Sequence, residues 1–271
     1  MNRNLDRRKF LKMMGIAGVA TVTPMCSISH KQKPNVLFIA VDDLRTELGC
    51  YDNPVIKTPN IDQLATQGRI FTNHFVQVPT CGASRCSLLT GKRPRFKWQL
   101  RNDAIVKGLS DKPESEYPET FIHHLRRNGY HTVGMGKISH HPDNLIYGYT
   151  QQPTNKKELP YSWDEFVFNS GKWKTGWNAF FGYANGENRQ SMNRQVKPYE
   201  CGNVDDEGYP DGLTAKLAVQ KLRELAQMRK PFFLGVGFFK PHLPFTAESA
   251  YRKNSKYESA RHSGTWYCGD H

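Results

Sequence analysis

Three short apolar segments, each followed by polar residues, constrain the fold of this chain more than any other feature. They span residues 34–41, 131–135 and 231–238, and the residues that follow them are Asp42-Asp43, Lys137 with His140, and Lys240 with His242. Their length and β-branched content predict strands, and we expect the first strand to be buried on both faces. In open α/β sheets, ligands bind beyond the carboxyl ends of the strands. The pattern therefore predicts that these polar side chains meet at one edge of a sheet.

Helical segments alternate with the predicted strands. Apolar residues at helical spacing and closing glycines predict helices at residues 58–65, 84–90, 119–127 and 213–228. This alternation predicts an α/β sandwich around a largely parallel sheet. Residues 147–210 break the pattern and are rich in aromatic, glycine and polar residues, so we expect a long irregular insertion that shapes a substrate cleft.

The first 30 residues have the features of a targeting segment. A twin-arginine motif at Arg7-Arg8 precedes a short apolar stretch at residues 13–22, which is shorter than the ~20 residues that a membrane-spanning helix needs. We expect residues 1–30 to be an export signal that directs the chain through the export machinery to the periplasm. A cytosolic amphipathic helix is the alternative. Cys26 lies in a poor lipoprotein cleavage box, so a lipid anchor there has weak support.

The charge balance favours anionic partners. The chain of 271 residues carries a net charge of +13, and residues 1–30 contain five basic residues and one acid, so the remainder keeps +9. Such a surface suits sulfated or phosphorylated polymers, and it is also a common solubilising feature. One basic cluster follows the second predicted helix: Lys92, Arg93, Arg95, Lys97 and Arg101. We find no nucleic-acid-binding motif and expect no nucleic-acid partner.

The six cysteines do not form a metal or redox motif. None of them is in a Cys-x-x-Cys pair. In an exported protein, Cys50, Cys86, Cys201 and Cys268 could form disulfides, and the sequence leaves the pairing open.

The acidic pair and the two histidines each allow two interpretations. Asp42 and Asp43 suit a hard divalent cation, which takes oxygen ligands, but Asp42 could instead cap a turn. His140 is a candidate proton-transfer residue or, beside His141, a histidine of a surface loop. His242 is a candidate anion ligand or, with prolines on both sides, part of a rigid turn.

The segment at residues 79–91 places the thiol of Cys81 at the start of a helix. A helix N-terminus has free N–H groups and a positive end, which suit a bound anion. Cys81 could also be a small buried hydrophobic residue, or a thiolate nucleophile activated by the helix end and Arg85.

Cys81-Gly82-Ala83-Ser84-Arg85, followed by Leu89-Thr90-Gly91, resembles the signature of the sulfatase family, in which Cys-x-Pro-x-Arg precedes Leu-Thr-Gly. Residues 34–43, 58–65, 136–140 and 240–245 also resemble family motifs, and the last two are most similar to the iduronate-2-sulfatase branch. The resemblance implies an alkaline-phosphatase-like α/β/α sandwich, incomplete at its C-terminus. Residues 31–248 would form the N-terminal part of the catalytic domain, and residues 249–271 a tail that does not match.

The resemblance also implies a mechanism. A maturation enzyme would oxidise Cys81 to formylglycine, although Ala83 stands where the common signature has Pro. One hydroxyl of the hydrated aldehyde would attack the sulfur of a sulfate ester, and the alcohol would depart. Loss of the second hydroxyl proton would then expel sulfate and regenerate the aldehyde. Asp42, Asp43 and residue 81 would ligate Ca²⁺ or Mg²⁺, Arg85 would steady the hydroxyl, Lys137 and His242 would hold sulfate oxygens, and His140 would handle a proton at the diol.

The function implied is a sulfuric ester hydrolase for sulfated sugars of the glycosaminoglycan type, such as 2-O-sulfated uronic acids. Family members continue well beyond the third strand and take further metal ligands from there. We therefore expect this chain to have reduced activity or none. One alternative is an inactive remnant that only binds sulfated glycans. Another is a phosphatase or phosphonate hydrolase of the same superfamily, against which Cys81 argues, because those enzymes typically place Ser or Thr at that position.

Overall fold

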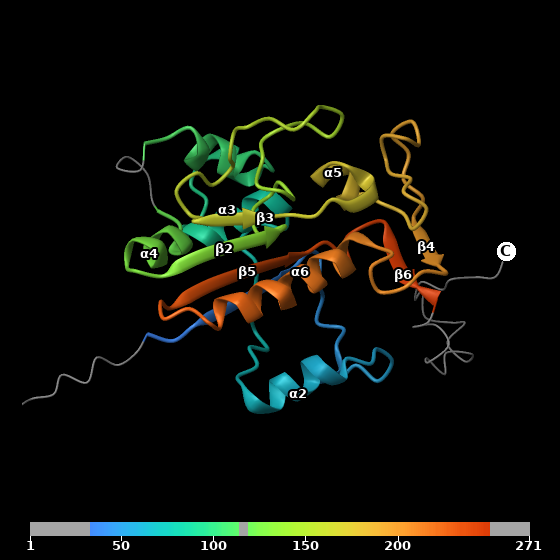
Figure 1. Cartoon of the computed structure of the whole chain (residues 1–271), viewed down its shortest axis with the longest axis horizontal. Coiled ribbons are helices and arrows are strands. Elements are labelled where there is room, and N and C mark those ends of the chain that lie inside the picture. Colours follow the sequence, from blue (N-terminus) through green and yellow to red (C-terminus); the bar gives the residue numbers. More distant parts are fainter. Residues whose placement is uncertain (1–32, 114–118, 250–271) are drawn as a thin grey trace, which may run out of the picture. The chain divides into compact units, whose positions relative to one another are not determined.

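The computed structural model describes residues 33–113 and 119–249, and its compact unit begins at Pro34 (Figure 1). The predicted export signal and nearly all of the predicted tail lie outside the described residues, so both remain predictions. The strands are β1 (Val36–Val41), β2 (His131–Gly136), β3 (Glu165–Val167), β4 (Tyr199–Gly202), β5 (Phe232–Phe238) and β6 (Phe245–Glu248). The α-helices are α2 (Pro59–Gln67), α3 (Cys81–Thr90), α4 (Phe121–Arg127), α5 (Gly176–Phe180) and α6 (Pro210–Leu225). Single turns of tighter or wider helix occur at Gly49–Tyr51, Lys97–Leu100, Val106–Ser110 and Gly171–Trp173.

The main sheet has four strands in the order β1-β5-β2-β3, and all neighbouring pairs are parallel (Figure 1). The three predicted core strands are thus adjacent in one sheet. Val41 lies opposite Phe238, and Gly136 lies opposite Gly237, so the carboxyl ends of β1, β5 and β2 are level. The residues that follow these strands therefore leave the sheet at the same edge. A separate two-stranded sheet pairs β4 with β6.

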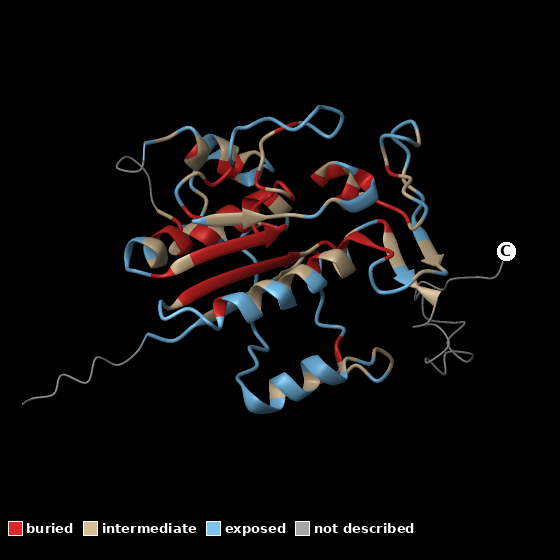
Figure 2. Cartoon of the chain, in the orientation of Figure 1, coloured by how far each residue is buried: buried red, intermediate tan, exposed pale blue. Residues whose placement is uncertain are grey.

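Helices cover both faces of the central strands. On one face, α6 packs against Val133, Met135 and Leu234. On the other face, residues of α3 and α4, including Leu89 and Ile122, pack with Phe233. Figure 2 shows β2 and β5 as buried along most of their length.

The prediction that β1 is buried on both faces is wrong. Leu37 and Ile39, which point to one face of this strand, are 49% and 52% exposed. Within the described residues β1 is an edge strand, and α6 packs on β5 and β2 instead. An apolar run of this kind indicates a strand but not which of its faces a helix will cover.

The four predicted helices are present, with shifted ends. Helix α3 begins at Cys81, three residues before the predicted start, and Gly91 ends it in a left-handed conformation. Residues 147–210 are largely irregular, as predicted, but they also contribute the short elements β3, α5 and β4. In the described part of the chain, no helix is long and apolar enough to span a bilayer.

Candidate active site

A close approach between two strand ends brings Lys137 into the site. Gly136 ends β2 with a positive φ of 64°, and a Cβ atom there would lie 2.1 Å from the carbonyl oxygen of Gly237. Glycine is therefore required at this position. The backbone N–H of Lys137 donates to the same oxygen at 3.0 Å. The chain thus leaves β2 in contact with the end of β5, and the Lys137 side chain turns toward β1.

Asp42, Lys137 and Arg85 form a buried group of charges at the end of β1. Asp42 is 5% exposed and Lys137 only 1% exposed, and the two side chains form an ion pair. Arg85 lies 3.6 Å from the carboxylate of Asp42 and donates hydrogen bonds to the carbonyl oxygens of Lys137 and Ile138. Burial raises the pKa of Asp42, but Lys137 and Arg85 outweigh that effect and hold it below its usual value. Burial lowers the pKa of Lys137, against the opposing effect of Asp42.

Cys81 is the first residue of α3, and its thiol donates to Oδ1 of Asp42 at 3.6 Å. The next residue, Gly82, donates its N–H to the Asn102 side chain at 3.0 Å, and a Cβ on it would lie 2.1 Å from the Asn102 carbonyl oxygen. The start of the helix is therefore locked against residue 102. Cys81 is half-buried, unlike the buried Cys86, so it is not simply a small core residue.

The electrostatic surroundings of Cys81 do not activate its thiol. Burial raises the pKa of Cys81, and the carboxylates of Asp42 and Asp43 add to that rise, while Lys137 opposes it. The thiol is therefore protonated at neutral pH. This disfavours the interpretation of Cys81 as a thiolate nucleophile activated by the helix end.

His140 lies beside this group in a buried position, so its interpretation as a surface-loop histidine is wrong. Burial lowers its pKa to about 3, and its Nδ1 atom has no hydrogen-bond partner among the described residues. The imidazole is therefore neutral at neutral pH. Its ring lies 5.3 Å from that of Trp177.

Glu158 supports the neighbouring histidine and was not predicted from the sequence. It accepts a hydrogen bond from the backbone N–H of His141 at 2.8 Å, and its other oxygen lies 3.1 Å from the His141 ring. Burial raises the pKa of Glu158, but the interactions with His141 outweigh it and keep the pKa low. Its position among Lys156, Lys157 and Pro160 in the sequence gives no signal of this burial.

The loop after β5 delivers His242. Its Nε2 atom lies 3.8 Å from Asp43, and its ring is 4.6 Å from that of Phe180. Asp211, in the first turn of α6, accepts from the backbone N–H groups of Phe239 and Lys240 at 2.9 and 2.8 Å and so fixes the start of this loop. Burial lowers the pKa of Lys240 to about 8. Asp211 was missed because an acid in a first helical turn usually serves only the helix itself.

The structure brings together five of the seven predicted site residues: Asp42, Cys81, Arg85, Lys137 and His242. His140 lies within electrostatic reach of Lys137 and Arg85, and its ring packs against that of Trp177. Asp43 lies at the rim, with its side chain 58% exposed and its backbone at a positive φ of 56°.

The donor atoms at this edge fit a divalent cation. Asp42, Cys81 and His242 each offer one ligand atom, and these atoms lie within 4.8 Å of one another. Asp42 and Asp43 supply carboxylate oxygens, which calcium and magnesium prefer. An oxygen in place of the Cys81 sulfur would make the set more suitable for a hard cation. Calcium takes about six to eight oxygen ligands, so water or residues beyond this group must complete its shell.

The parallel sheet covered by helices on both faces, with this ligand set at its strand ends, defines an alkaline-phosphatase-like α/β sandwich. The chain belongs to the sulfatase family, whose model matches residues 34–264. The predicted family and fold class are thus confirmed.

Two relatives and one solved structure illustrate these similarities. The chain is 33% identical over 219 residues to iduronate 2-sulfatase of Homo sapiens, which covers 81% of this chain and 37% of that protein. It is 28% identical over 257 residues to a sulfatase of Formosa agariphila, covering 88% of this chain and 45% of that protein. The fold is similar to that of a phosphonate monoester hydrolase of Agrobacterium radiobacter, with a TM-score of 0.53, 22% identity, and coverage of 82% and 44%. The chain therefore spans less than half the length of these relatives.

Proposed function

We propose that this chain is the part of a sulfuric ester hydrolase that carries the reacting residue, and that its substrates are sulfated sugars of the glycosaminoglycan type. One observation supports the proposal most strongly. The half-buried thiol of Cys81, at the N-terminus of α3, lies 3.6 Å from the buried Asp42, with Lys137 and Arg85 against the same carboxylate. The likeness to iduronate 2-sulfatase supports a 2-O-sulfated uronic acid as the substrate.

Conversion of Cys81 to formylglycine would supply an oxygen nucleophile that the protonated thiol does not offer. A divalent cation held by Asp42 and Asp43, together with residue 81, would stabilise negative charge on the sulfate oxygens. We propose Ca²⁺, with Mg²⁺ as the alternative, because the carboxylates provide hard oxygen ligands.

The residues of the chain itself would hold and orient the anion. Lys137 and Arg85 place two buried positive charges beside residue 81, and such preorganised charges stabilise the sulfate group as its charge redistributes. His242 would hold a further sulfate oxygen from the loop after β5. His140 is neutral and lies within electrostatic reach of Lys137 and Arg85, and it would exchange a proton with the hydroxyl of residue 81.

The proposed cellular location is argued from the N-terminal sequence, which lies outside the described part of the chain. The motif around Arg7-Arg8 supports export to the periplasm by the twin-arginine machinery, which carries folded proteins, so maturation of Cys81 would precede export. A sulfatase-maturating enzyme is then a required partner. Anchoring through Cys26 would be an additional feature of the exported form.

The main alternative is a remnant that binds sulfated glycans without turnover. The exposed basic cluster at residues 92–101, which follows α3, favours glycan binding in either case. A phosphonate or phosphate ester hydrolase is the other alternative, and the fold alone admits it.

The deciding experiment is co-expression of the full chain with a sulfatase-maturating enzyme, followed by mass spectrometry of the peptide that contains residue 81. We expect conversion of Cys81 to formylglycine and calcium-dependent hydrolysis of an aryl sulfate. Cys81→Ala should abolish this turnover, whereas Cys201→Ala, at another half-buried free cysteine, should not. Unmodified Cys81 after co-expression, or faster hydrolysis of a phosphonate ester than of a sulfate ester, would refute the proposal.

A further inference from the structure

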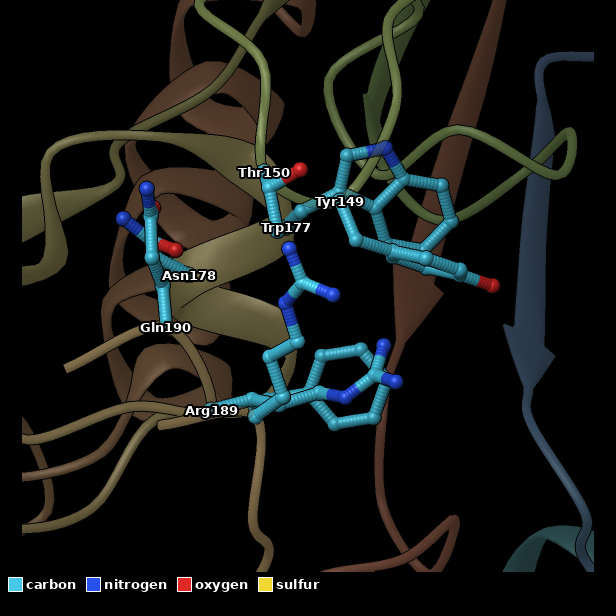
Figure 3. Close-up of a pocket in the computed structure, with 8 residues that line it drawn as sticks. Tyr149, Thr150, Trp177, Asn178, Arg189 and Gln190 are labelled. Atoms are coloured by element: carbon cyan, nitrogen blue, oxygen red, sulfur yellow. The ribbon is translucent and has the colours of Figure 1, made fainter. Parts of the chain in front are cut away.

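A pocket beside the charged group has the composition of a sugar-binding site. It has a volume of about 240 Å³ and is lined by Tyr149, Thr150, Trp177, Asn178, Phe181, Arg189, Gln190 and Arg194. Figure 3 shows the rings of Tyr149 and Trp177 on one side and the amides of Asn178 and Gln190 on the other. Pockets that enclose drug-sized ligands measure roughly 300–1,000 Å³. This pocket is therefore sized for a single sugar ring.

Aromatic contacts join the pocket to the proposed catalytic residues. The Trp177 ring lies 4.5 Å from that of Tyr149 inside the pocket and 5.3 Å from that of His140 in the site. Phe181 similarly lines the pocket, and its ring is 6.5 Å from that of His242. Burial raises the pKa of Tyr149, Arg189 opposes the rise and Cys81 adds to it, so Tyr149 is within electrostatic reach of both. A ring in this pocket would thus lie on the side of the site where His140 and His242 are.

Arg189 gives the pocket a positive charge. Its guanidinium lies 5.1 Å from the ring of Tyr149 and 5.4 Å from that of Phe181, so two aromatic faces hold it in place. In the described ranges, neither Arg189 nor Arg194 forms an ion pair with a carboxylate. Lys197, by contrast, is paired with Glu187. An arginine that is fixed in position and lacks an acidic partner can bind a planar oxyanion through two parallel hydrogen bonds.

We propose that this pocket binds the sugar ring that bears the scissile sulfate or its direct neighbour, and that Arg189 selects rings with a second anionic group. The ring's C–H face would stack on the exposed Tyr149, which packs edge-to-face on the buried Trp177, and its hydroxyls would contact Asn178 and Gln190. The anionic group would be either a uronic acid carboxylate or a second sulfate, which present the same kind of oxygen atoms to a guanidinium. This inference rests on the proposed function for the choice of a sugar as ligand, but not for the pocket's charge preference.

The test is binding of three disaccharides of one linkage, none of which carries a sulfate ester at the scissile position. One contains a uronic acid, the second has that carboxylate reduced to an alcohol, and the third is the reduced form with a sulfate in its place. Isothermal titration of the full chain should show at least about 10-fold tighter binding of one or both anionic probes than of the neutral one. The ratio between the first and third probes identifies the preferred anion.

Arg189→Gln should weaken binding of the anionic probes by about 10- to 100-fold and so abolish their advantage over the neutral probe. Arg223→Gln, the same change on the exposed side of α6, should leave that advantage intact. Arg189→Lys should restore part of it, because the charge remains while the two-pronged geometry is lost. Equal binding of all three probes, no binding of any probe, or an unchanged preference in Arg189→Gln would overturn the inference. Aryl sulfate hydrolysis, measured separately, tests the proposed function. Charge-selective binding without hydrolysis refutes only the proposed function, and hydrolysis without charge-selective binding refutes only this inference.

Discussion

The charged group at the strand ends and the pocket beside it differ in whether their positive charges are paired with a carboxylate. In the charged group, Lys137 and Arg85 are buried against Asp42 within the chain itself. In the pocket, Arg189 lies beside two aromatic rings, and it forms no ion pair with a carboxylate of the described residues. Buried charges need partners for the fold to form, whereas a half-exposed charge can remain available to a ligand. The comparison indicates which residues position the site and which are free to select a substrate.

The largest expected effect is on stability, and it should occur in the charged group but not in the pocket. Asp42→Ala should reduce the free energy of unfolding by about 3–5 kcal/mol, because it leaves the buried Lys137 without its counter-ion. Arg189→Ala and the rim variant Asp43→Ala should each change it by less than about 0.5 kcal/mol. Urea unfolding at neutral pH measures all three. A stable Asp42→Ala protein would show that Lys137 loses its proton or reaches water at little cost, and the comparison would fail.

The next largest effect tests how the helix end is held. Gly82→Ala should cost about 1–3 kcal/mol, because its Cβ would meet the backbone of Asn102 and push Cys81 away from Asp42. Gly148→Ala is the matched control, since the three nearest atoms there belong to the flexible side chain of Gln151. Both the midpoint temperature of thermal unfolding and the conversion of Cys81 by the maturation enzyme should be lower in Gly82→Ala but unchanged in Gly148→Ala. Equal stability of the two variants would mean that the start of α3 can move freely.

The charged group could be predicted from the sequence because its signals are local. Apolar runs of strand length end at Asp42 and before Lys137, and the parallel arrangement then brings these ends together. Cys81 was placed correctly because the signature and its closing Gly91 bracket a short helix. The exposure of Leu37 and Ile39 was not foreseeable, because which strand α6 covers depends on packing between distant segments.

The pocket could not be predicted because no local pattern connects its residues. Tyr149, Trp177 and Arg189 come from three places in an irregular region, and only the folded chain brings them to one cavity. Their aromatic and polar composition was the sole signal, and it indicated a cleft without indicating its members. Glu158 was missed for the same reason, because its burial depends on the backbone N–H of His141.

A smaller effect should appear behind the site, at Glu158. Glu158→Gln should cost about 1–3 kcal/mol at pH 7, because the buried oxygen facing the His141 ring is replaced by an amide. The folded-state pKa of Glu158 lies below its usual value of 4.5, so its contribution is present above pH 4.5 and is lost as the pH falls through the folded-state pKa. The gap between wild type and variant, followed by urea unfolding, should therefore narrow on acidification. A gap that widens toward low pH would contradict the assignment of a charged Glu158. The exposed Glu224→Gln serves as the control.

The smallest effect concerns Glu119, whose ion pairs are accessible to solvent. Its carboxylate accepts from Arg127 at 2.5 and 2.6 Å, and the hydrogen bonds from Arg127 lower its pKa to about 2. Exposure screens this interaction, so Glu119→Gln should cost only about 0–1 kcal/mol despite that large pKa shift. The contribution should be present above pH 4.5, fade between pH 4.5 and about 2, and weaken in high salt. Denaturant unfolding across pH and salt measures this, and a salt-independent cost as large as that of Asp42→Ala would show that burial is not what distinguishes paired charges in this protein.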